Sequence, residues 1–193
     1  MANKGARQIY FAPFVGDAPE EGMPTYAEEL RLSKLVQVDT AITMAAGELY
    51  ADDELSEQAS EFVSATSTVQ ITDVNADISE TVFGATVDDN GEVISNKDDE
   101  APYGGLGYIR VGQVDGVTHY QPIFFPKARA ALANETDQTK AASITFNTSG
   151  IPFTVFPLPD GNWRFTQRFT GADAYTKAKA YLTAKYAGTP VTP

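Results

Sequence analysis

The decapeptide VSATSTVQIT, residues 63–72, decides the fold class of this chain. Its apolar side chains alternate with hydroxyl and amide side chains, which is the period-two pattern of a strand with one buried face. The residue types also have high β-propensity, so composition and pattern agree. The same alternation predicts further strands at residues 9–15, 36–44, 103–114, 117–125, 143–148, 151–156 and 162–169. In the last of these, we expect Trp163, Phe165 and Phe169 on one face.

Turn and cap residues organise these strands. Asp115-Gly116, Asn90-Gly91 and Pro159-Asp160-Gly161 are turn sequences of the hairpin kind, so neighbouring strands should be mostly antiparallel. Two helices are predicted, a short one at 76–83 and a C-terminal one at 172–187. Asn75 and Gly84 are placed to cap the first. The second has an apolar stripe suited to packing on a sheet, formed by Tyr175, Ala178, Leu182 and Tyr186.

These patterns predict a mainly β fold, an antiparallel β-sandwich or barrel with one short helix and one C-terminal flanking helix. We expect one domain over residues 1–193. Two polar stretches, residues 16–24 and 88–100, are expected to be loose in an isolated subunit.

Composition narrows the functional classes. The chain has 193 residues, 42% of them hydrophobic, with no cysteine. A chain of this length buries roughly 70% of its unfolded surface, so it needs no disulfide scaffold. Its apolar runs are far shorter than the ~20 residues that cross a bilayer. Residues 1–7 lack the apolar region of a secretory signal, so we expect synthesis and folding in a cytoplasm.

The net charge of −12 is unevenly distributed. Residues 1–47 carry 4 basic and 6 acidic groups, residues 48–100 carry 1 and 15, and residues 101–193 carry 9 and 5. Nucleic-acid affinity comes mainly from basic side chains, so a gripping contact with DNA or RNA is not expected. The asymmetry suits like subunits that pack head to tail, and it equally suits a solvated acidic loop.

No catalytic constellation emerges from the sequence. His119 is the only histidine, which excludes a histidine-based metal cluster, and we expect a structural role for it. No serine lies in a G-x-S-x-G elbow. Gly104, Gly105 and Gly107 do not fit the dinucleotide-binding pattern, and we expect them to permit a bulge or a close backbone approach. The chain is therefore predicted to be no enzyme and to need no cofactor.

Three acidic clusters could in principle hold calcium or form a glycosidase pair, namely residues 52–54, 88–89 and 98–100. The spacing of an EF-hand loop is absent, so solvated turns are the preferred interpretation.

Two longer strings resemble a known family. YADDELSEQASEFVSATSTVQITDVNADISETVFGATVDDNGEV at residues 50–93, followed by DDEAPYGGLGYIRV at 98–111, resembles the major tail protein family of long-tailed, non-contractile bacteriophages. The likeness covers the acidic start, the long strand, the short helix, the turn at 88–92 and the strand opened by Ala101-Pro102-Tyr103. It continues more loosely through residues 143–169.

The resemblance implies a tail tube subunit, assembled as stacked hexameric rings around a channel through which phage DNA passes into the host. About four strands per subunit make about 24 strands, and ~4.8 Å per strand gives a diameter near ~37 Å. The implied location is the virion, and the host cytoplasm during assembly. Implied partners are other copies of the chain, a tape-measure protein, tail assembly chaperones and tail end proteins. Double-stranded DNA would pass without specific binding, and no membrane is implied.

Two sets of residues become candidate sites. The first would line the channel or its loops and repel phosphates within a Debye length of ~8 Å. It comprises Asp52, Asp53, Glu54, Glu57, Glu61, Asp88, Asp89, Asp98, Asp99 and Glu100. The second is a ring-stacking hairpin at residues 35–50, whose stretch 41–47 is too apolar to be left in water. Its candidate residues are Leu35, Val36, Val38, Ile42, Met44 and Leu49, and the alternative is that they belong to an ordinary core.

Three other functions stay open. A tube protein of a phage-derived, bacteriocin-like particle would have the same features. A carbohydrate-binding or adhesin-like β-sandwich would use some of the nine tyrosines as an exposed platform. A glycosidase would use paired carboxylates.

Overall fold

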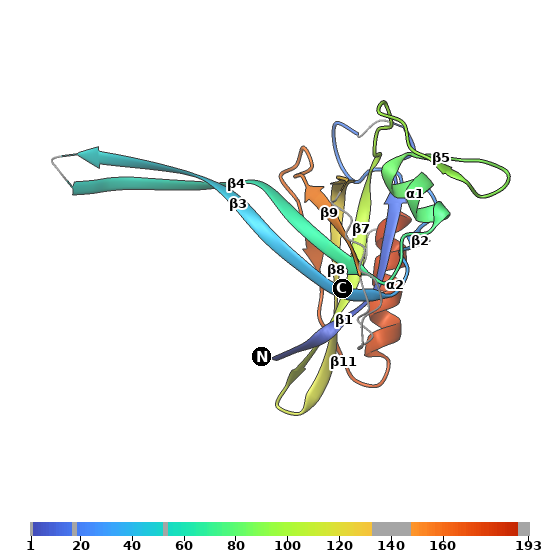
Figure 1. Ribbon diagram of the computed structural model, residues 1–193. Helices are drawn as coiled ribbons and strands as arrows, with labels where there is room; N and C mark the ends of the chain where they lie inside the picture. Colours follow the sequence, from blue (N-terminus) through green and yellow to red (C-terminus); the bar gives the residue numbers. More distant parts are fainter. Residues whose placement is uncertain (1, 17–18, 52–53, 133–147, 189–193) are drawn as a thin grey trace, which may run out of the picture.

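The computed structural model describes residues 2–16, 19–51, 54–132 and 148–188 (Figure 1). Within them, nine strands form one antiparallel sheet in the order β2-β1-β7-β8-β9-β4-β3, with β10 and β11 paired to β8. The prediction of a mainly β, antiparallel fold with two helices is confirmed. The strands are β1 (Ala2–Pro13), β2 (Leu30–Arg31), β3 (Leu35–Ala51), β4 (Glu54–Ile71), β7 (Tyr103–Val114), β8 (Val117–Ala130), β9 (Ser149–Val155), β10 (Phe165–Thr166) and β11 (Phe169–Thr170).

The sheet curls because its two edge strands follow each other in the chain. Only residues 32–34 join β2 to β3, although these strands lie at opposite edges of the sheet. The fully buried Leu32 donates its N–H to the Ile9 carbonyl (3.0 Å), and the Lys34 carbonyl accepts from the Thr72 N–H (3.0 Å). These bonds hold the two edges together, so the sheet encloses a core.

The inside of the curl is filled by alternate residues of five strands, as the period-two patterns require. Helix α1 (Ala76–Phe83) covers this core with Ile78 and Val82. The strand residues of the core include Ile9, Phe11, Ala65, Val69, Ile71, Leu106, Tyr108, Ile123, Phe125, Ile151, Phe153 and Val155.

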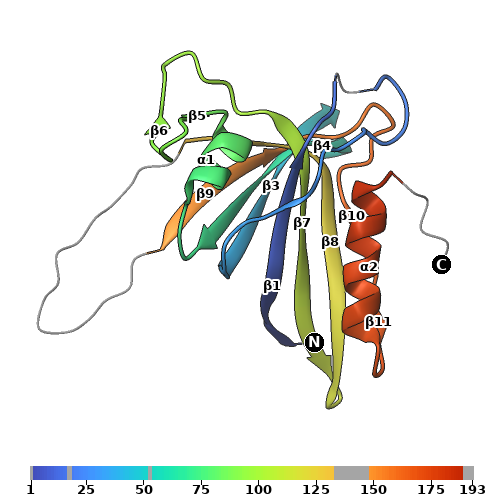
Figure 2. The ribbon, with the colours of Figure 1, turned by 90° about the vertical axis from the view of Figure 1, so that its right-hand side faces the viewer.

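Helix α2 (Ala174–Tyr186) lies against the outer face of β7 and β8 (Figure 2). Its buried residues are spaced like the predicted stripe, which is confirmed, and they pack on Ala12, Ile109 and Phe124. The Tyr186 hydroxyl donates to the Tyr10 carbonyl (2.9 Å), so it has a hydrogen-bond partner where the helix buries it.

Local signals located the helices well. Helix α1 has the predicted bounds, with Asn75 Oδ1 accepting from the Ile78 N–H (3.0 Å) and Gly84 in the left-handed conformation. Helix α2 begins two residues later and ends one residue earlier than predicted. Asp115-Gly116 joins the antiparallel strands β7 and β8, as expected.

The prediction for residues 162–169 is wrong in two respects. Only β10 and β11 are strands there, because the chain leaves a tight turn at 158–162 and first meets β8 at Phe165. Trp163 precedes the strand, so alternation does not govern its direction. It packs on the core inside the curl, whereas Phe165 and Phe169 pack on the α2 side.

Other predicted segments are more ordered or lie elsewhere. Residues 88–100 contain a strand that was not predicted, because β5 (Thr86–Val87) and β6 (Val93–Ile94) pair around the turn at 88–92. Residues 16–24 form no helix or strand where described, and the Val15 N–H bonded to the Thr25 carbonyl (2.9 Å) closes that loop. Residues 143–147 of a predicted strand lie outside the described residues.

Candidate assembly surface

A long two-stranded ribbon leaves the body of the molecule (Figure 1). Strands β3 and β4 pair from Leu35 with Ile71 to Ala51 with Glu54, but β9 pairs with β4 only from Ala65 to Ile71. We call residues 41–51 and 54–64 the arm. Neither outer edge of the arm has a strand partner among the described residues. Eleven residues per strand give the arm a reach of roughly 35 Å.

The expected hairpin at 35–50 is corrected by this pairing. Those residues form a single strand, and β4 is the returning strand of the hairpin. In the segment ELSEQASE at 54–61, the even-numbered residues are polar and the odd-numbered ones mix apolar with charged side chains, so neither set forms the apolar face of a predicted strand. Its pairing with β3 makes it a strand, and the sequence offers no local sign of that partner.

The predicted hairpin residues divide into two groups. Leu35 and Val38 pack on the core, as the alternative interpretation requires. Val36, Ile42 and Met44 are 50%, 49% and 49% exposed. The side chain of Leu49 lies outside the described residues. The core therefore ends within β3, and the apolar pattern continues beyond it into solvent.

This exposed ribbon has the properties of an assembly element. A two-stranded hairpin is marginally stable in water, and unpaired strand edges are templates for another chain. Residues 41–47, AITMAAG, contain no charge and no proline that would discourage such pairing. The arm can therefore gain stability by adding a strand or by covering Ile42 and Met44.

The candidate acidic residues lie in two separate places. Glu54, Glu57 and Glu61 belong to the arm, whereas Asp52 and Asp53 lie outside the described residues. The remaining candidates lie in the turn between β5 and β6 or in the segment after β6, beside α1 and on the side of the body opposite the arm (Figure 1). That second group is Asp88, Asp89, Asp98, Asp99 and Glu100. One subunit does not bring the two groups together.

Several carboxylates of the second group stabilise their own turns. Asp88 Oδ1 accepts from the backbone N–H groups of Glu92 (2.7 Å) and Asn90 (2.9 Å), and these bonds lower the pKa of Asp88. Asp99 Oδ2 accepts from the Asn96 N–H (2.6 Å). These two carboxylates cap the turns in which they lie, which agrees with the solvated-turn interpretation.

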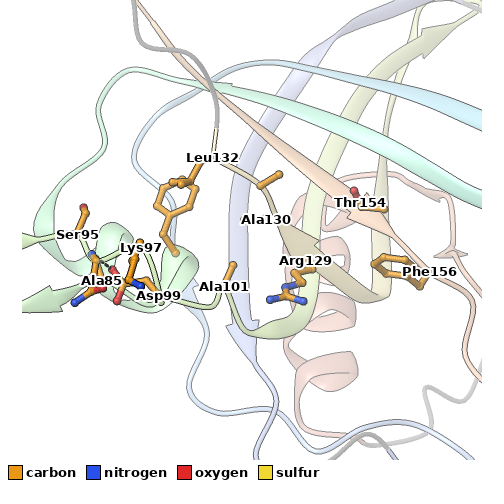
Figure 3. A pocket seen from close by; sticks show the side chains of 13 residues that line it. Ala85, Ser95, Lys97, Asp99, Ala101, Arg129, Ala130, Leu132, Thr154 and Phe156 are labelled. Carbon is orange, nitrogen blue, oxygen red and sulfur yellow. Dashed lines mark hydrogen bonds between the residues drawn. The ribbon is translucent and has the colours of Figure 1, made fainter.

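A cleft of about 440 Å³ lies between this acidic segment and the ends of β8 and β9 (Figure 3). Phe83, Leu132 and Phe156 supply much of its apolar lining, and Lys97, Asp99 and Arg129 are its charged residues. Among the described residues that line it there is a single carboxylate, so they supply no acid and base pair for glycoside hydrolysis.

Other features that could support chemistry are limited. His119 is 2% exposed, and its Nε2 has no hydrogen-bond partner in the described part of the chain. The described residues contain no group of three or more histidine, cysteine, aspartate or glutamate side chains placed to hold a metal ion. Among them, no helix is long and apolar enough to cross a membrane.

Comparison with protein-family models finds no matching family, and a search of curated proteins finds no match. A function must therefore be argued from the sequence and from the arm.

Proposed function

We propose that this protein is the subunit of a self-assembling hollow tube, of the kind formed by the major tail proteins of long-tailed, non-contractile phages. The observation that supports this proposal is the arm, a two-stranded ribbon that projects from a well-packed body, carries exposed apolar side chains at Ile42 and Met44, and has no strand partner on either outer edge among the described residues. An arm that contacts a different surface of the next copy makes a heterologous interface, which closes a ring or continues as a filament.

The charge distribution supports the conduit part of the proposal. Residues 48–100 contain 15 acidic groups and 1 basic group, and six subunits would each bring one of the two acidic groups of this segment to the channel. Such a wall repels DNA phosphates at short range and lets the duplex slide without attachment. Stacked hexameric rings, a virion location, and a tape-measure protein, chaperones and tail end proteins as partners belong to the same proposal. A bacteriocin-like tube would use the same surfaces.

The adhesin alternative finds less support. A glycan platform needs exposed aromatic rings, but Tyr26, Tyr108, Tyr181 and Tyr186 are buried. Tyr103 is 37% exposed, with the Lys127 ammonium 5.1 Å from its ring centroid.

Deleting the arm tests the proposal. Thr43 and Ser64 face each other in the ladder, so replacing residues 44–63 by Asn-Gly closes a two-residue hairpin and keeps the β4–β9 pairing. Electron microscopy of the full chain at high concentration should show hollow rods or six-fold rings. The deletion variant should remain a folded monomer with cooperative thermal unfolding. Normal tubes from this variant, or a full chain that stays monomeric, would refute the proposal.

A further inference from the structure

The only tryptophan of the chain lies at the root of the arm. Trp163 belongs to the irregular segment between β9 and β10, and its ring stacks on that of Phe62, with centroids 4.4 Å apart and an interplanar angle of 11°. It is also nearly parallel to the core ring of Phe125, at 6.2 Å and 12°. The Arg164 guanidinium lies 4.7 Å from the Trp163 centroid. The three rings connect the arm to the core.

Phe62 is distinctive among the described side chains of the arm. Residues 41–47, 58–61 and 63 are exposed, and Ser64 and Phe62 are half-buried. Of these described side chains, Phe62 is the apolar one that packs on the core inside the curl. Backbone pairing with the body ends at Ala65. Beyond that residue, the Phe62–Trp163 stack is the aromatic contact that holds the arm against the body.

A β-bulge makes this contact possible. The core-facing residues of β4 are Ala65, Ser67 and Val69, so strict alternation would turn Phe62 to the opposite face. The register shifts between the pairs Thr43–Ser64 and Met44–Phe62, which leaves Val63 as the extra residue. Phe62 thereby moves to the core face, and Val63 becomes 49% exposed. The bulge thus exposes Val63 and packs Phe62 against Trp163, which indicates that the contact between the arm and the body depends on this bulge.

We propose that Trp163 is a positioning residue that fixes the direction of the arm in the unassembled subunit by stacking on Phe62. A ribbon held in one direction loses less conformational entropy when a partner binds, so its association is faster and tighter. The consequence for assembly rests on the proposed function. The stack itself is a property of the single subunit and is measurable there.

Hydrogen exchange of the intact chain tests the stack. Phe62→Ala and Trp163→Ala should raise exchange about tenfold or more in arm residues 41–47 and 58–64, while Trp163→Phe should keep most of the protection. Exchange in β7 should stay unchanged, which separates a loose arm from a loose body. Phe169→Ala is the matched control, because it removes a ring that contacts Tyr181 of α2 on the other side of the sheet (6.2 Å). If Trp163→Ala fails to fold, Phe62→Ala gives the same readout from the arm side.

Assembly kinetics give the second readout, from light scattering of the same variants. Phe62→Ala and Trp163→Ala should slow tube growth about tenfold or more, and Trp163→Phe should restore it. The inference is overturned if hydrogen exchange in the arm of Phe62→Ala is unchanged. It is also overturned if exchange in the arm rises but the variant forms tubes at the normal rate. Arm exchange as expected in a full chain that never assembles supports the stack and refutes the proposed function instead.

Discussion

Glycines in β7 allow side chains of α2 and of the loop before β2 to pack closely on this strand. A Cβ atom on Gly107 would lie 2.9 Å from Tyr186 Oη and 3.1 Å from Leu182 Cδ2, both in α2. One on Gly105 would lie 2.8 Å from Tyr26 Cε1, and the register shift between Gly104 and Leu106 marks a bulge. The expectation of a bulge or a close backbone approach is confirmed at Gly104, where an added Cβ would meet the Ala12 carbonyl oxygen, whereas the atoms close to Gly105 and Gly107 belong to side chains.

Gly107→Ala should therefore push α2 away from the sheet and lower the free energy of unfolding by roughly 1–3 kcal/mol. Urea unfolding followed by circular dichroism measures this change. The control is Gly47→Ala in the arm, where an added Cβ meets no atom within 4 Å, so the free energy should change by less than about 0.5 kcal/mol. Equal effects of the two substitutions would contradict the close-packing explanation.

Two buried tyrosines should make the fold sensitive to alkali. Burial raises the pKa of Tyr26 and of Tyr186, and their hydroxyls donate to the carbonyls of Pro126 (2.8 Å) and Tyr10 (2.9 Å). The unfolded chain releases these protons near pH ~10, before the folded chain does. Stability is then complete below that pH and falls as the pH rises above it.

Thermal unfolding of the full chain between pH 8 and 11 should show this fall. Tyr186→Phe removes one titrating group, so its melting temperature should decline less steeply as the pH rises. At pH 8 its free energy of unfolding should already be lower by the value of one hydrogen bond, about 1 kcal/mol. Identical slopes for the two proteins would show that Tyr186 does not contribute to the alkaline sensitivity.

At the scale of elements, the sequence predicts the helices and strands whose ends are set by residues close by in the chain. Helix α1 was located to the residue because Asn75 and Gly84 act within one turn of its ends. The arm was not delimited, because residues 54–61 become a strand only through pairing with β3. The contact of Trp163 with Phe62 depends on a bulge and on an irregular segment, and neither follows from a period-two pattern.

The apolar face of the arm should contribute to assembly and little to folding. Ile42→Thr combined with Met44→Thr keeps β-branched or strand-compatible residues and removes the exposed apolar side chains. We expect tube formation to need about fivefold to thirtyfold more protein, as one lost interface contact of about 1–2 kcal/mol would require, with unfolding nearly unchanged. Val93→Thr combined with Ile94→Thr is the control, because these exposed residues lie on β6, away from the arm. Equal losses would mean that general surface apolarity drives association.

At the scale of the whole molecule, the two acidic groups lie on opposite sides of one body, and the chain beyond residue 100 carries 9 basic and 5 acidic groups. The orientation of the subunits in a ring therefore determines which acidic group faces the channel. Whichever it is, the assembled wall should repel DNA rather than retain it. The repulsion should be strongest at low ionic strength, where the Debye length reaches ~30 Å at 0.01 M.

Sedimentation of assembled tubes with short duplex DNA measures this property. We expect the DNA to stay in the supernatant at every salt concentration, including ~0.01 M, at which any basic surface would bind most tightly. Two charge-reversed variants show whether the assay can detect DNA binding on either side of the body. One is Glu61→Lys, and the other combines Asp89→Lys with Glu100→Lys. All three carboxylates are exposed. DNA that sediments with unmodified tubes at low salt and is released at high salt would contradict a repelling channel, because it requires a wall on which lysine and arginine outweigh the carboxylates.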